Sequence, residues 1–365
     1  MKYIFSTSLI IAGLFFLLTN FIQSQSDPFR INETGPRTVQ SNDIFINWIQ
    51  NNKSYQKVYR LKTEGIYSNP DSILVDTLFT KTSKREDIRP ALQSYNDVAS
   101  GRFNKSHFDN TISIWLTPTS AQKIEIMISK FDTTGFFTST SNTNLEAGET
   151  VYDICVKTGD FDTDSLDEFL IAYRDASDSV IICLYDVDST LQATQIKRTS
   201  TVKLGAIQGA SRMVRYYIET TDLNGDGKDE ITLFTKEGVI QDWELPINVR
   251  VYSIVNNNFV AKGTNIIQTL KPPYTLWEFV MGSSKGQFDN DDSDELIFGS
   301  ITQTFEGTDT YRWVYSIIVE ASEDLQTITL GLNYSNSESF YNAFVHTPFC
   351  VAAGDLNDDG IDEGV

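Results

Sequence analysis

The chain has 365 residues, and its 49 acidic and 29 basic side chains give a formal net charge of −20 at pH 7. This balance argues against nucleic acid or an anionic membrane surface as the main partner, because a phosphate backbone is bound by clustered Lys and Arg. An apolar fraction of 40% excludes disorder over most of the chain. The only histidines are His107 and His346, which excludes a multi-histidine metal centre.

Residues 1–24 have the pattern of a secretory signal peptide. Lys2 precedes an apolar run over residues 9–18, and polar residues up to Ser24 follow it. The alternative is an uncleaved signal anchor, because residues 4–22 are just long enough to span a bilayer. No second apolar run of about 18 residues follows. We therefore expect a secreted or extracellular protein, or one on the extracellular face of a membrane.

Residues 25–90 form an N-terminal segment that lacks the acidic motif of the later chain. Its strand-like runs, residues 55–61 and 73–79, predict either a degenerate first repeat or a strand that closes a ring of repeats.

Two residue types bear on export. Three cysteines are too few for a disulfide framework, and Cys155 and Cys350 are interpreted as small buried hydrophobes at equivalent positions of a repeat. N-glycosylation sequons occur at Asn32, Asn52, Asn104 and Asn333. They predict a glycoprotein if the host glycosylates secreted chains.

From residue 91 to residue 365 the chain repeats an acidic nonapeptide. Its five copies, the first to fifth loops, occupy residues 102–110, 160–168, 222–230, 287–295 and 355–363, with starting points 58, 62, 65 and 68 residues apart. The first copy, RFNKSHFDN, is degenerate. The last four read DFDTDSLDE, DLNGDGKDE, QFDNDDSDE and DLNDDGIDE, and they hold 19 of the 49 acids. One such loop per period of about 60 residues predicts an array of structural repeats.

The segments between the loops have the character of β-strands. Runs that directly follow a loop are residues 169–173, 231–234 and 296–298, and later runs in each period are residues 123–129, 180–185, 249–255 and 311–319. Several alternate polar and apolar residues, as half-buried strands do, and none shows a helical period. Three or four strands per period of about 60 residues are typical of a β-propeller blade.

The motif D-x-[DN]-x-D-G-x-x-[DE] before a hydrophobic strand resembles the FG-GAP, or VCBS-type, repeat of integrin-α-like β-propellers. Residues 222–230 stand close to that consensus, and the resemblance covers about residues 95–365. It implies an all-β propeller of about seven blades, in which each loop joins the first two strands of a blade and holds calcium. Since the sequence stops at Val365, where a strand should begin, we expect an incomplete ring of four to five blades, truncated at the C-terminus.

The chemistry of the loops independently indicates calcium, a hard cation that takes six to eight oxygen ligands. Alternate residues supply side-chain oxygens, a later residue supplies its carbonyl, and the ninth position closes the shell. Four loops supply predicted ligands, and these are Asp160, Asp162, Asp164, Leu166 and Glu168; Asp222, Asn224, Asp226, Lys228 and Glu230; Asp289, Asp291, Ser293 and Glu295; and Asp355, Asn357, Asp359, Ile361 and Glu363. Those that would coordinate through the backbone carbonyl oxygen are Leu166, Lys228, Ser293 and Ile361. Gly227 is expected to permit a positive φ.

Two loops depart from this pattern. Gln287 replaces the first Asp of the fourth loop, so we expect a weaker site there. The first loop carries almost no negative charge and is expected to bind no metal, with Arg102 in place of the cation; its residues at the ligand positions are Arg102, Asn104, Ser106 and Asn110. The aspartates at position eight of the other loops are expected to cap the turn or face solvent; they are Asp167, Asp229, Asp294 and Asp362. An EF-hand does not fit, because its twelfth position is acidic and helices flank it.

These features predict an exported, calcium-stabilised recognition or adhesion module whose partner is an extracellular protein or glycan. No catalytic constellation is found, and the one G-x-S-x-G match, residues 282–286, is interpreted as a chance turn because no helix follows it. The alternative is the non-catalytic propeller of a larger enzyme of phospholipase or polysaccharide lyase type, whose catalytic domain lies beyond this sequence. A structural surface-layer protein is a third possibility. A membrane link is expected only through a missing C-terminal anchor or an uncleaved signal anchor.

Overall fold

In the computed structural model the chain is built from β-strands. The structure describes residues 29–34, 43–50, 53–61, 75–83, 96–105, 110–116, 123–131, 137–146, 150–204, 216–237, 245–270, 279–289, 291, 293–306, 309–340, 351, 353–354 and 361–364. Within these ranges every regular element is a strand, which confirms the all-β class. No helix in this part of the chain has the length and apolar character to cross a bilayer. The predicted signal peptide lies outside it.

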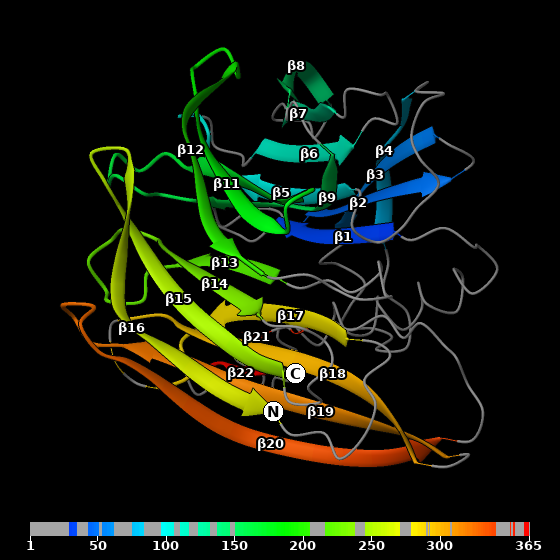
Figure 1. Ribbon diagram of the computed structural model, residues 1–365. Coiled ribbons are helices and arrows are strands. Elements are labelled where there is room, and N and C mark those ends of the chain that lie inside the picture. The colour runs from blue at the N-terminus through cyan, green and yellow to red at the C-terminus, as the bar shows by residue number, and fades with distance from the viewer. Residues whose placement is uncertain are drawn as a thin grey trace, which may run out of the picture. The chain divides into compact units, whose positions relative to one another are not determined.

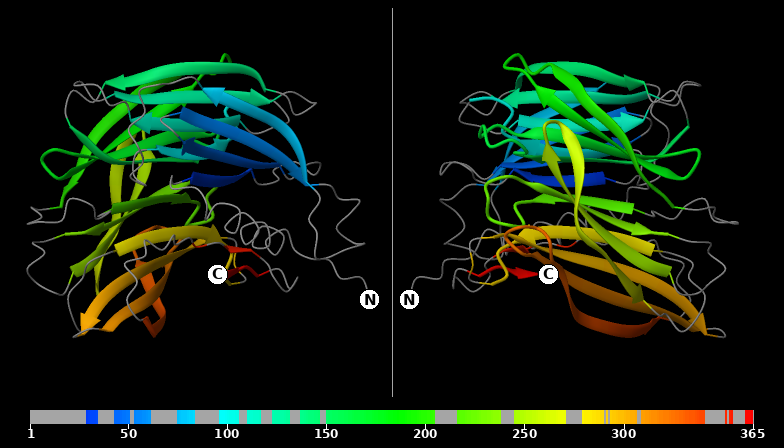
Figure 2. Two further views of the ribbon diagram at one scale, coloured as in Figure 1. Left: turned by 90° about the vertical axis from the view of Figure 1, so that its right-hand side faces the viewer. Right: turned by 60° about the vertical axis from the view of Figure 1, so that its left-hand side comes forward.

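Five sheets of four strands follow one another along the chain (Figure 1 and Figure 2). They contain β1 (Phe29–Thr34), β2 (Asp43–Gln50), β3 (Lys53–Leu61) and β4 (Val75–Ser83); β5 (Asn96–Gly101), β6 (Asn110–Leu116), β7 (Lys123–Phe131) and β8 (Phe137–Glu146); β9 (Val151–Gly159), β10 (Glu168–Asp175), β11 (Ser179–Val187) and β12 (Ala193–Lys203); β13 (Tyr216–Thr221), β14 (Glu230–Lys236), β15 (Leu245–Val255) and β16 (Asn258–Leu270); and β17 (Phe279–Gly286), β18 (Glu295–Glu306), β19 (Asp309–Ala321) and β20 (Ile328–Phe340). A short pair follows, β21 (Ala353–Gly354) and β22 (Glu363–Gly364). None of these sheets closes on itself.

Each sheet is a meander in which sequence neighbours pair, for example β13 with β14, β14 with β15 and β15 with β16, all antiparallel. The seven runs that the alternation of residues predicted fall within β10, β14, β18, β7, β11, β15 and β19. The N-terminal runs lie in or overlap β3 and β4, which belong to a complete four-stranded sheet.

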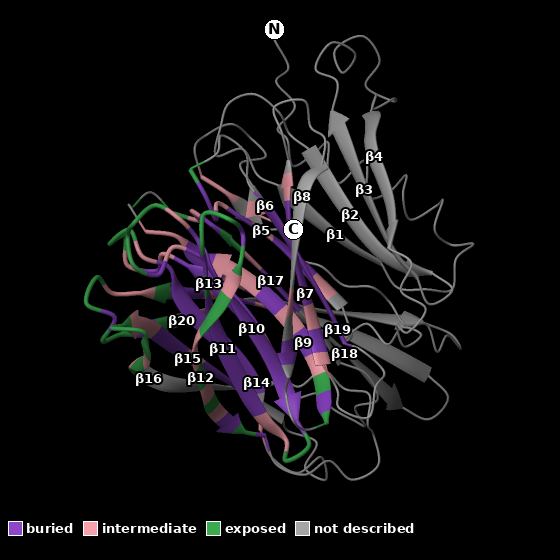
Figure 3. Ribbon diagram, turned by 90° about the horizontal axis from the view of Figure 1, so that it is seen from above, coloured by how far each residue is buried: buried purple, intermediate pink, exposed green. Residues whose placement is uncertain are grey.

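The chain divides into two compact units, one within residues 10–201 and one within residues 202–365. In the first unit, β10 is buried along its whole length (Figure 3). Its core contains Phe169, whose ring stacks on Tyr185 with centroids 4.7 Å apart and meets Phe103 edge-on. Phe103 belongs to the first loop, so that loop is anchored in the hydrophobic core of the unit.

The second unit has its own core between the fourth and fifth sheets. Phe234 of β14 stacks on Phe298 of β18, with ring centroids 4.2 Å apart. Leu223, the second residue of the third loop, is 1% exposed and packs into the same cluster. Phe103 with Phe169 in the first unit, and Phe234 with Phe298 in the second, therefore join consecutive sheets.

Three interpretations made from the sequence can be checked here. The G-x-S-x-G match lies inside or at the end of strand β17, which agrees with the absence of a nucleophile elbow. Cys155 is half-buried rather than buried, and Cys350 lies outside the described residues. Asn104, one of the four sequon positions, is only 8% exposed.

Candidate metal centre

Each acidic loop joins the first and second strands of its sheet. The first loop connects β5 to β6, the second β9 to β10, the third β13 to β14, the fourth β17 to β18 and the fifth β21 to β22. In every case the ninth residue of the nonapeptide is the first residue of the second strand. The strand therefore fixes the backbone of the closing ligand position independently of any bound metal.

The second loop folds around its own carboxylates. Asp160 accepts the backbone N–H groups of Thr163 at 2.7 Å through Oδ1 and of Ser165 at 3.0 Å through Oδ2. Asp162 and Asp164 each accept the N–H two residues further on, at 3.1 and 2.8 Å. Thr163 and Ser165 have φ values of +72° and +68°, a left-handed backbone that L-residues rarely adopt. These bonds hold the loop in a tight turn around a set of oxygens.

The third loop repeats this geometry with glycines at the left-handed positions. Asp222 accepts the N–H groups of Asp226 at 3.0 Å and Gly227 at 2.8 Å. Gly227 has a φ of +84°, as predicted, and Gly225 has a φ of +70°. A Cβ on Gly227 would meet no atom within 4 Å, so glycine is favoured there by backbone conformation and not by lack of space.

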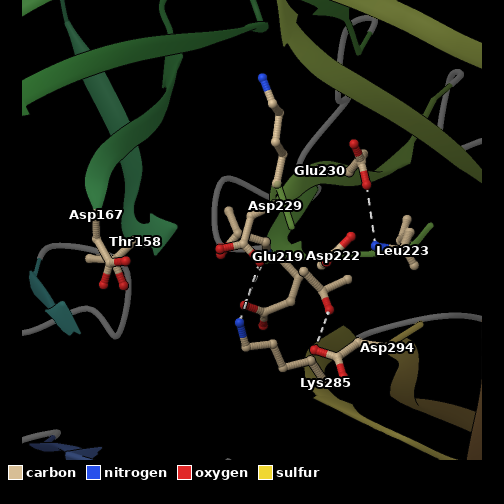
Figure 4. Close-up of polar contacts among 12 residues, drawn as sticks. Thr158, Asp167, Glu219, Asp222, Leu223, Asp229, Glu230, Lys285 and Asp294 are labelled. Atoms are coloured by element: carbon tan, nitrogen blue, oxygen red, sulfur yellow. Dashed lines mark hydrogen bonds and ion pairs between the residues drawn. The ribbon is translucent and has the colours of Figure 1, made fainter. Parts of the chain in front are cut away.

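The closing glutamates are buried. Glu168, Glu230 and Glu295 are 8%, 2% and 3% exposed. Each accepts the backbone N–H of the loop's second residue, with distances of 3.0 Å to Phe161, 3.2 Å to Leu223 and 2.6 Å to Phe288. Figure 4 shows this contact for Glu230, with Asp222 beside it. The apolar second residue therefore has a role that the sequence analysis missed: its side chain anchors the loop while its amide holds the closing carboxylate.

Burial and neighbouring carboxylates make these glutamates hard to ionise without a cation. Burial raises the pKa of Glu168 to about 8, and the loop aspartates add to the effect. The pKa of Glu230 is raised to about 8 and that of Glu295 to about 7, again chiefly by burial. A bound cation would remove this penalty, since it pairs with the charged form.

Two loops bring three carboxylates together closely enough to share one ion. Oxygens of Asp160, Asp162 and Glu168 all lie within 4.8 Å of one another, and those of Asp289, Asp291 and Glu295 do the same. In the fourth loop the side-chain amide of Gln287 donates to the carbonyl of Asp291, so glutamine still bridges the turn without adding a charge. Carboxylates alone form both clusters, which fits a hard cation such as Ca²⁺ or Mg²⁺.

The other predicted ligand positions are less complete. In the third loop Asn224 occupies the second side-chain column, and the carboxylates of Asp222, Asp226 and Glu230 do not make an equally tight group. In the first loop the buried amide of Asn110 makes no hydrogen bond to a described residue, so the closing contact of the glutamates is not made there. Ser106 lies outside the described part, as do Asp355, Asn357 and Asp359, while Ile361 and the backbone of Glu363 lie within it.

The prediction for the aspartates at position eight was wrong. Asp167 and Asp229 are only 6% and 8% exposed, and Asp294 and Asp362 are half-buried. Asp167, Asp294 and Asp362 instead bond to the preceding loop, and Asp229 lies 3.6 Å from the ammonium group of Lys285. The bonding partners of Asp167 and Asp362 lie 65 and 75 positions away in sequence, so a local pattern does not reveal them.

Comparison with known proteins does not identify a family. No family model matches the chain, and no curated protein matches it. Among solved structures it is similar to a chain of the S. cerevisiae core factor crystal structure, with 8% identity and a TM-score of 0.42, over 89% of this chain and 52% of that one. The chain thus spans about half the length of that protein, and a likeness this small decides neither fold type nor function.

Proposed function

We propose that the chain is part of a calcium-binding β-propeller of FG-GAP type. The observation that carries this proposal is the convergence of three carboxylates, one of them a buried glutamate, in the second and fourth loops. The repeated placement of each loop between the first two strands of a meander supports it. So does the adjacency of first strands: β1 contacts β5, β5 contacts β9, β13 contacts β17 and β17 contacts β21, as expected for strands around a central axis.

Calcium has a structural role in this proposal. It joins loop carboxylates that otherwise repel one another and lets the buried glutamate ionise. At a free calcium concentration of 100 times the dissociation constant, one site would stabilise its unit by about 2.7 kcal/mol. We expect calorimetry to detect calcium binding and thermal unfolding to shift upward with CaCl2 relative to EDTA, with MgCl2 as a comparison.

A matched pair of variants assigns the effect to the loop. Asp162→Asn removes a ligand of the second site, whereas Asp186→Asn removes one charge from an exposed position of β11. Calcium stabilisation of the unit within residues 10–201 should fall in the first variant and persist in the second. Equal melting temperatures in CaCl2 and EDTA for the unmodified protein would refute the calcium assignment.

We further propose that the module recognises an extracellular protein or glycan. The support is the signal-like segment at residues 1–24 together with the loops that the proposed calcium would brace. Fluorescently labelled protein should bind the surface of intact cells in calcium and be released by EDTA. N-terminal sequencing of the exported protein should place cleavage after Ser24. This function would be contradicted if the labelled protein did not bind the cell surface in the presence of calcium, or if the protein stayed inside the producing cell.

A further inference from the structure

The aspartate at position eight of a loop forms a two-point contact with the loop before it. Asp167 donates its backbone N–H to the carbonyl of Arg102 at 2.9 Å, and its carboxylate accepts the N–H of Arg102 at 2.7 Å. Asp362 and Gln287 make the same pair of bonds, at 2.7 and 3.0 Å. The contact therefore recurs in both units, which indicates that it belongs to the repeat.

The glycine that precedes the clamped loop leaves room for this contact. A Cβ on Gly101 would lie 3.0 Å from a carboxylate oxygen of Asp167, and one on Gly286 would lie 2.7 Å from that of Asp362. The third loop has Thr221 at this position instead. Its hydroxyl donates to the carboxylate of Asp294 at 3.4 Å, so a side-chain donor takes the place of the backbone N–H.

In the third loop the contact falls on a proposed metal ligand. Asp294, from the fourth loop, donates its N–H to the carbonyl of Asp222 at 3.0 Å. Asp222 is the first carboxylate of the third loop, and both its side-chain oxygens organise the turn. The position of this ligand is thus fixed from the following sheet, by a residue 72 positions further along the chain.

A second bond from the following sheet orients the next ligand. The side-chain amide of Asn224 donates to the carbonyl of Glu323, in the turn between β19 and β20, at 3.0 Å. Nδ2 also donates to the carboxylate of Asp226 at 3.3 Å, while Oδ1 accepts the N–H of Asp226 at 3.3 Å. An aspartate at position 224 would instead set a carboxylate against a carbonyl oxygen.

We propose that Asp294 is a positioning residue for the metal site of the third loop, so that calcium affinity there depends on the docking of the sheet β17–β20. This inference rests on the proposed calcium function. Asp294 touches no ion in the third loop. It acts through two bonds, from its N–H to the carbonyl of Asp222 and from the hydroxyl of Thr221 to its carboxylate. Groups that orient metal ligands from outside the first coordination shell typically contribute about 10- to 100-fold in affinity. Because such coupling is reciprocal, calcium in the third loop also stabilises the docked fifth sheet.

Hydrogen exchange with mass spectrometry can test this on the full chain, because it reports each loop separately. The calcium concentration that gives half-maximal protection is measured for peptides that cover the second and third loops. Asp294→Ala keeps the backbone N–H but removes the carboxylate that accepts the Thr221 hydroxyl and so holds Asp294 against the third loop. It should raise this midpoint about 10- to 100-fold for the third loop and leave the second loop unchanged. Thr221→Val, which removes only the hydroxyl donor, should cause a smaller shift in the same direction. Thr221→Val can replace Asp294→Ala as the test variant if Asp294→Ala does not fold.

Asp167→Ala is the matched control, because it removes the same type of contact from the first loop, which has no closing glutamate. It should lower stability but leave the third-loop midpoint unchanged. A purely structural Asp294 would lower stability in EDTA without moving the midpoint, and that result would overturn the proposal while calcium binding stands. If the unmodified protein shows no calcium protection in any loop, the proposed function fails and this inference fails with it.

Discussion

Replacement of Glu230 by Gln should have opposite effects on stability with and without calcium. In the metal-free protein burial raises the pKa of Glu230 from 4.5 to about 8. Between these values the folded state keeps a proton that the unfolded state has released, so stability is fully present below pH 4.5 and is lost as the pH rises to 8. The loss grows by about 1.4 kcal/mol per pH unit and reaches roughly 3 kcal/mol at pH 7.

Glutamine removes this loss because it carries no charge to bury. Its side-chain oxygen can still accept the N–H of Leu223, which lies 3.2 Å from the glutamate in the structure. In EDTA at pH 7 we therefore expect Glu230→Gln to be more stable than the unmodified protein by up to about 3 kcal/mol. In saturating calcium the order should reverse, since the variant lacks the closing carboxylate of the third site.

Urea unfolding followed by tryptophan fluorescence, from pH 5 to pH 8.5 in EDTA and in CaCl2, measures both effects. Glu323→Gln is the control, because it removes the same charge from an exposed position in the same unit. The slope of metal-free stability against pH should flatten in Glu230→Gln and remain in Glu323→Gln. A variant that is less stable than the parent in EDTA at pH 7, or the same pH slope in both variants, would refute the burial argument.

Two further predictions concern the backbone of the loops. Ser165→Gly should stabilise its unit by about 1 kcal/mol, because Ser165 has a φ of +68°, which glycine adopts without strain. The control Ser200→Gly, at an exposed position of β12, should destabilise the unit. Thermal unfolding in EDTA measures both variants, and a change in stability of the same sign in both would count against backbone strain at Ser165. Gly286→Ala should cost about 1–3 kcal/mol in urea unfolding, because its Cβ would lie 2.7 Å from the carboxylate of Asp362. Gly331→Ala, whose Cβ would lie 3.7 Å from its nearest neighbour, should stay within about 0.5 kcal/mol of the parent.

The strands and the loop positions could be predicted because they depend on short-range patterns. The continuous apolar run 169–173 lies within the fully buried β10, and the run 249–255, which is rich in β-branched residues, lies within β15. The left-handed conformation of Gly227 was predicted for the same reason, because the turn around Asp222 demands it locally. In the second loop Asp160, Asp162 and Glu168 of the predicted set meet, whereas Asp164, predicted as a further side-chain ligand, is not part of that close group.

The environment of the same residues could not be read from those patterns. Nothing in the spacing of Asp167 distinguishes a solvated turn residue from one that is 6% exposed and bonded to Arg102. Likewise the apolar second residue of each loop looks like a minor variation until Leu223 is seen in the core with its amide on Glu230. Both features depend on how one sheet docks on the next.

The acidic residues show which properties follow from the sequence and which follow from the tertiary structure. The sequence by itself determined that 19 of the 49 acids lie in four nonapeptides, and that each nonapeptide precedes a strand, because composition and period are local properties of the chain. Only the tertiary structure decided that the closing glutamates of the second, third and fourth loops are buried, and that the position-eight aspartates of the second, fourth and fifth loops reach back to the loop before. The contacts with the preceding loop arise from hydrogen bonds across 65 to 75 residues, which form only when consecutive sheets pack against each other.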